Sequence, residues 1–123
     1  MGNKLMNLSF KADFYKSIGA NNRAVKVYLE LLNQMEYSNS QNIIYRKNIL
    51  SNLPPVIINK AFIYCCIAEC YVSLKYKKYA ISYYKRINKE YDVELFPKHF
   101  KKRLSSLNIA IFKLSKIVNG EAV

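Results

Sequence analysis

The sequence predicts an all-α fold of helical hairpins, in one domain that spans residues 1–123. Three observations lead to this prediction. Glycine and proline, which interrupt helices, occur only three times each. Apolar residues recur three and four positions apart over long windows, as on one face of a helix, and no stretch alternates convincingly with the period of two of a strand. Apolar residues make up 51% of the chain, enough for a domain with its own core.

The first two helices are expected at about 5–17 and 22–35. Leu8, Ala12 and Tyr15 lie three and four apart, and Gly19 is suited to end the first helix. The second helix carries a broad apolar stripe, which contains Ala24, Tyr28, Leu31 and Met35.

Residues 39–56 are predicted to form an insert between two helical hairpins. A short, weak helix is expected over about 41–50 of this insert. Pro54 and Pro55 then require an extended or kinked connection, because proline cannot continue a helix and restricts the residue before it.

Three further helices are expected at about 58–74, 77–90 and 98–118. The last has the cleanest pattern in the chain, with alternating spacings of four and three: Phe100, Leu104, Leu107, Ile111, Leu114 and Val118. Pro97 suits the first turn of this helix.

Two segments of 34 residues, 5–38 and 61–94, repeat one arrangement of small and aromatic residues. In each segment an alanine is followed three residues later by a tyrosine, twelve later by a second alanine, and four after that by a second tyrosine. The two sets are Ala12, Tyr15, Ala24 and Tyr28, and Ala68, Tyr71, Ala80 and Tyr84. Small residues let two helix backbones approach closely, so the four alanines are expected at buried helix crossings.

This spacing resembles the tetratricopeptide (TPR) family, with helix 98–118 similar to a C-terminal capping helix. The resemblance implies a short array of stacked hairpins that holds a peptide or a partner helix, as an adaptor or chaperone does. In general design it is loosely similar to small TPR-type chaperones of bacterial type III secretion, and a host-interaction protein is equally compatible. The two units begin 56 residues apart, not a multiple of 34, so another bundle of helical hairpins remains an alternative.

The sequence predicts no catalytic residue, cofactor or metal site, and therefore a protein that is not an enzyme. Cys65, Cys66 and Cys70 share one apolar stretch with no second cysteine pair, which favours core packing over zinc binding with His99. No glycine-rich phosphate loop is present. We expect the cysteines to be reduced, and the sequence shows no recognisable signal peptide. These two features together predict a cytoplasmic protein. The longest apolar stretch, 61–74, is too short to span a membrane and contains Glu69.

The net charge of +12 favours anionic partners, although AT-rich coding would also enrich lysine. The segment from Lys75 to Arg103 contains ten basic residues but only three acidic residues, and tyrosines are interleaved among them. We expect an acidic or amphipathic protein segment to bind there, and a basic helical nucleic-acid-binding protein is the alternative. The residues expected to contact the partner are Tyr64, Tyr71, Lys75, Lys77, Lys78, Tyr83, Lys85 and Arg86.

Overall fold

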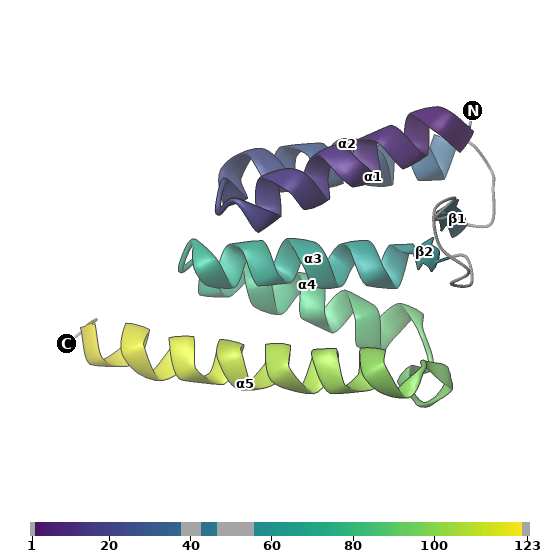
Figure 1. The fold of residues 1–123 in the computed structure, drawn as a ribbon. Coiled ribbons are helices and arrows are strands. Elements are labelled where there is room, and N and C mark those ends of the chain that lie inside the picture. The colour runs from purple at the N-terminus through teal and green to yellow at the C-terminus, as the bar shows by residue number, and fades with distance from the viewer. Residues whose placement is uncertain (1, 38–42, 47–55, 122–123) are drawn as a thin grey trace. The chain divides into compact units, whose positions relative to one another are not determined.

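The computed structural model describes residues 2–37, 43–46 and 56–121, with side chains described for 4–35 and 60–114. These residues form a helical protein with one short pair of strands (Figure 1). The elements are α1 (Gly2–Ser17), α2 (Asn21–Tyr37), β1 (Ile43–Arg46), β2 (Val56–Asn59), α3 (Lys60–Ser73), α4 (Lys77–Glu90), the 3-10 turn η1 (Val93–Leu95) and α5 (Lys98–Glu121). The chain divides into two compact units, Met1–Ile63 and Tyr64–Val123.

In the first unit, α1 and α2 pack against each other as a hairpin. Gly19 adopts a φ of 81°, a conformation that favours glycine, and thereby ends α1. Ala12 and Ala24 are fully buried, as the repeat predicts. The Tyr28 hydroxyl donates a hydrogen bond to Asp13 Oδ1 at 2.6 Å, which fixes α2 against α1.

The strands correct the expectation that the chain contains no sheet. β1 pairs antiparallel with β2, from Ile43 opposite Asn59 to Arg46 opposite Val56. The weak helix expected over 41–50 is therefore wrong at 43–46, and α3 begins at Lys60 instead of Ile58. Both strands are rich in isoleucine and valine, whose branched side chains favour a pleated backbone when a pairing partner is available.

The second unit consists of α4, η1, α5 and nearly all of α3. The α3–α4 hairpin buries Ala68 and Ala80 completely, so all four repeat alanines are buried as predicted. The α5 stripe is also confirmed: Phe100, Leu104, Leu107, Ile111 and Leu114 are buried. The side chain of Val118, which the pattern assigned to the same stripe, lies outside the described residues.

Polar contacts fix α5 in the second unit. Arg103 Nε donates a hydrogen bond to Glu69 Oε2 at 2.9 Å, and Arg103 Nη2 donates another to Glu69 Oε1. The guanidinium therefore binds the carboxylate in a bidentate ion pair. The connection from α4 is shaped by Asp92, whose side chain accepts a hydrogen bond from the Glu94 backbone N–H at 3.1 Å. These contacts hold α3, α4 and α5 in one arrangement and so position the surfaces described next.

None of the described helices combines the length and apolar character that crossing a bilayer requires.

Candidate functional site: a tyrosine ladder beside a row of lysines

Five tyrosines of α3, α4 and their connecting turn pack ring against ring. Tyr71 lies at the centre, with its ring centroid 5.2 Å from that of Tyr79, 6.0 Å from Tyr83 and 6.2 Å from Tyr76. Tyr64 continues the series, 6.0 Å from Tyr83. We call these five residues the tyrosine ladder. Aromatic pairs at these distances attract each other beyond the area they bury, so the ring contacts stabilise the ladder.

Helical spacing and one turn produce the ladder. Tyr64 and Tyr71 are seven residues apart and share one face of α3, whereas Tyr79 and Tyr83 are four apart on α4. Lys75 adopts a positive φ of 64°, which reverses the chain between the helices. The Tyr76 backbone N–H then donates to the Tyr71 carbonyl at 2.9 Å, which brings the two rings together.

Tyr64 forms the buried end of the ladder. Its hydroxyl donates to Glu90 Oε1 at 3.2 Å. Burial, and then the neighbouring Glu90 carboxylate, raises the pKa of Tyr64 to about 12. The guanidinium carbon of Arg86 lies 5.3 Å from the Tyr64 ring centroid and 5.4 Å from that of Tyr83. Tyr64 therefore supports the surface from within, and Arg86 covers this end.

The other end of the ladder is open. The side chains of Tyr76 and Tyr79 are 50% and 55% exposed, whereas Tyr71 and Tyr83 are half-buried. Sequence reasoning did not select Tyr76 or Tyr79 as site residues, although Tyr76, Tyr79 and Tyr83 are spaced by three and four. That spacing was the available signal. Which tyrosines stay accessible depends on the packing of the hairpin, which the spacing alone does not reveal.

A row of lysines runs along the outward face of α4. Lys78, Lys85 and Lys89 share this face with Ser82, and all four are exposed. We call the three lysines the lysine row. Within the described part of the chain, none of them lies within ion-pair distance of a carboxylate.

The other predicted cations lie elsewhere on the hairpin. Lys75 is exposed in the turn, and Lys77 is half-buried on a different side of α4, the side that carries Tyr84. The structure thus brings together Tyr64, Tyr71, Tyr83 and Arg86 of the predicted set. Lys78 and Lys85 of that set lie on the adjacent exposed face of α4.

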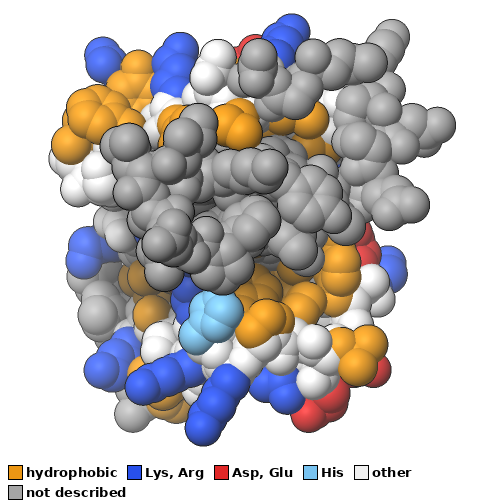
Figure 2. Space-filling model, turned by 45° about the vertical axis from the view of Figure 1, so that its right-hand side comes forward, with side chains coloured by type: hydrophobic (Ala, Val, Ile, Leu, Met, Phe, Trp, Pro, Cys, Tyr) orange, Lys and Arg blue, Asp and Glu red, His pale blue; other side chains and the backbone are white. Residues whose placement is uncertain are grey.

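The four described carboxylates of this unit each contact another group of the protein. Glu69 bonds to Arg103, Glu90 accepts from Tyr64, and Glu94 pairs with Lys101 at 3.5 Å. Asp92 caps η1. On the face drawn in Figure 2, Lys and Arg side chains are widely spread, whereas Asp and Glu gather in few places. The positive charge of the outward face of α4 is therefore available to an anionic partner.

The cysteines and the histidine lie apart from this surface. Cys65, Cys66 and Cys70 are thiols, not disulfides, and lie buried in α3, whereas His99 is exposed in the first turn of α5. Burial raises the pKa of the Cys65 thiol. Among the side chains that the structure describes, no cluster of three or more His, Cys, Asp or Glu residues could hold a metal ion.

No family model matches the chain, and neither the curated proteins nor the solved structures contain a match to it.

Proposed function

We propose that this chain is a non-enzymatic protein-binding module whose tyrosine ladder and lysine row hold an acidic segment of a partner protein. The observation that carries the proposal is the exposed pair Tyr76 and Tyr79 on the same hairpin as three lysines that pair with no described carboxylate. Tyrosine combines a large contact area with few rotatable bonds, which is why it is enriched in binding interfaces. The lysines supply charge complementarity to an acidic partner.

The packing of the rings favours a protein partner over a nucleic acid. Bases stack on open aromatic faces. In the ladder the rings lie 5.2 to 6.2 Å from one another, so each ring already contacts a neighbouring ring. The exposed parts of Tyr76 and Tyr79 offer ring surface and hydroxyl groups to protein side chains and carboxylates.

The buried thiols support the non-enzymatic part of the proposal. A cysteine acts as a nucleophile through its thiolate, and burial of Cys65 disfavours that form. The TPR-like spacing extends the proposal to a cytoplasmic adaptor or chaperone, of the kind that serves bacterial secretion or host interaction.

Charge reversal on the lysine row tests the proposal. The probe is a fluorescein-labelled 20-residue amphipathic peptide of Glu, Leu and Phe, about six turns if it is helical. We expect the double substitution Lys78→Glu and Lys85→Glu to weaken its binding about tenfold or more, mainly through slower association. The control is Lys11→Glu with Lys26→Glu, which makes the same charge change at exposed positions of α1 and α2.

A mixed RNA and single-stranded DNA pool, titrated at several salt concentrations, tests the alternative. For a nucleic-acid-binding protein, the logarithm of affinity falls linearly with the logarithm of salt concentration. If the pool binds more tightly than the peptide and the lysine substitutions abolish that binding, the protein-binding proposal is wrong. Equal effects of the two lysine double variants on the peptide would also contradict it.

A further inference from the structure

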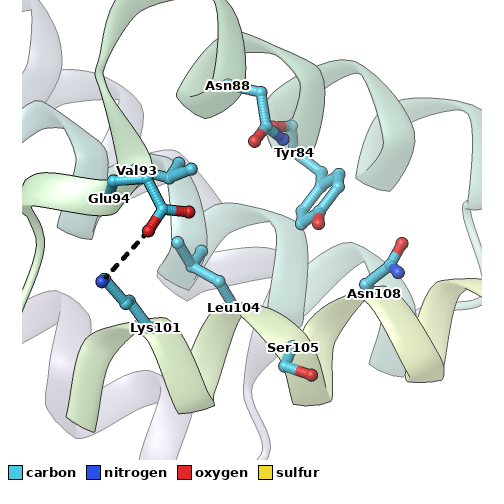
Figure 3. A pocket seen from close by; sticks show the side chains of 8 residues that line it. All are labelled: Tyr84, Asn88, Val93, Glu94, Lys101, Leu104, Ser105 and Asn108. Carbon is cyan, nitrogen blue, oxygen red and sulfur yellow. Dashed lines mark hydrogen bonds and ion pairs between the residues drawn. The ribbon is translucent and has the colours of Figure 1, made fainter. Parts of the chain in front are cut away.

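An open groove of about 280 Å³ lies between α4, η1 and α5 (Figure 3). Tyr84 and Asn88 of α4 form one wall, and Ser105 and Asn108 of α5 form the other. The buried side chain of Leu104 points up between the walls.

The groove carries hydrogen-bonding groups that the described protein does not use fully. The Asn88 amide nitrogen donates to the Tyr84 carbonyl at 3.2 Å, which leaves its side-chain oxygen as an acceptor. Asn108 and Ser105 are exposed and make no hydrogen bond to another described side chain. A carboxamide has the same donor and acceptor groups as a peptide bond, so asparagines on two walls of a groove are complementary to polypeptide backbone.

We propose that this groove binds the backbone of an extended polypeptide segment through Asn88 and Asn108. The inference rests on the proposed function, because it gives the same partner protein a second point of attachment on α4. A segment that follows the lysine row can enter the groove, since Asn88 lies three residues after Lys85 and is its neighbour on the surface of α4.

The hydrogen-bonding groups of the groove favour an extended segment over a helix. A helix satisfies its own backbone groups, whereas an extended chain presents unpaired N–H and C=O groups to the asparagines. An extended segment is therefore the expected occupant.

The electrostatics of the groove favour backbone recognition over binding of a charged group. Lys101 lines the groove but pairs with Glu94 at 3.5 Å, which closes one end with a neutral ion pair. The other walls are uncharged. The side chain of the bound segment that contacts Leu104 is then expected to be small or apolar. At its other positions the segment is expected to accept many different residues.

Selection from a phage library of random linear decapeptides, with the full chain as the target, supplies the probe. Peptides that bind are synthesised, and their affinities are measured for the wild type and for Asn88→Ala with Asn108→Ala. Each neutral hydrogen bond corresponds to about fivefold in affinity, so we expect the double substitution to weaken binding about 25-fold. Asn33→Ala, at an exposed position of α2, is the matched control and is expected to change nothing.

Two further measurements make the result decisive. Methylation of single backbone nitrogens in the peptide needs no change in the protein, and at one or two central positions it is expected to weaken binding about fivefold or more. Uncharged selected peptides should bind the Lys78→Glu, Lys85→Glu variant as tightly as they bind the wild type. Failure of the lysine-row proposal therefore leaves this result unchanged, whereas failure of the groove proposal is detected with the asparagine double variant. The inference is overturned if no peptide is enriched, if the asparagine double variant binds as the wild type does, or if no backbone methylation weakens binding.

Discussion

Truncation of Arg103 should destabilise the second unit far more than truncation of Lys101, although both residues form ion pairs from the first turns of α5. Arg103 grips Glu69 with two donors, and the two side chains are only 32% and 23% exposed. Lys101 and Glu94 are 42% and 84% exposed. The comparison isolates the effect of burial on an ion pair within one helix.

The magnitude follows from what each substitution leaves behind. Arg103→Ala leaves the Glu69 carboxylate more than three-quarters buried without its guanidinium. Removing one partner of a fully buried pair costs about 3–5 kcal/mol, and an exposed pair contributes about 0–1 kcal/mol. Because the Arg103–Glu69 pair is partly solvated, we expect Arg103→Ala to lower the free energy of unfolding by about 2 kcal/mol, and Lys101→Ala by less than about 0.5 kcal/mol.

Urea denaturation followed by circular dichroism measures both losses. A third variant, Glu69→Gln with Arg103→Met, removes both charges and keeps most of the side-chain volume. It should recover much of the stability lost in Arg103→Ala, because no buried charge is left unpaired. Equal losses for Arg103→Ala and Lys101→Ala, or a double variant less stable than Arg103→Ala, would refute this account of the α3–α5 contact.

Two other predictions follow from buried groups of the same unit. An unfolded tyrosine ionises near pH 10 and burial raises the pKa of Tyr64 to about 12, so its contribution to stability is complete below pH 10 and is lost as the pH rises through 12. In urea unfolding at several pH values, Tyr64→Phe should therefore show a smaller loss over this range than the wild type, and Tyr79→Phe, at an exposed position, should not. A chromogenic thiol reagent should label none of the three buried cysteines in the native chain and all three in urea, and elemental analysis should find no zinc. Rapid labelling of the native protein, or stoichiometric zinc, would contradict the assignment of these cysteines to the core.

Much of the helical fold could be predicted because a helix produces a periodic pattern of apolar residues that is visible in the local sequence. The expected helix 77–90 coincides with α4, and the others agree with the structure to within a few residues at most boundaries. The buried positions of Ala12, Ala24, Ala68 and Ala80 also follow from spacing, since it places each alanine on the apolar face of its helix. The TPR-like stacking and the adaptor role remain predictions.

The candidate site could be predicted only in part. The sequence showed that tyrosine and lysine occur together in α3 and α4. It did not distinguish the buried Tyr64 from the exposed Tyr76 and Tyr79. It also grouped Lys77 with Lys78, although adjacent residues on a helix point about 100° apart. The groove lined by Asn88 and Asn108 had no signal in the sequence, because its walls come from two helices.

The sequence by itself determined the helices, their apolar faces, the excess of positive charge and the burial of the cysteine stretch, because each depends on residues within a few turns of one another. Tertiary structure alone decided the pairing of Ile43–Arg46 with Val56–Asn59, the bond between Arg103 and Glu69, and the stacking of Tyr71 on Tyr83. Each of these joins separate elements whose meeting depends on how a turn directs the chain and how side chains fill the space between helices. A periodic pattern identifies the face that packs, but the groups that meet across it are set by the three-dimensional approach of the backbones.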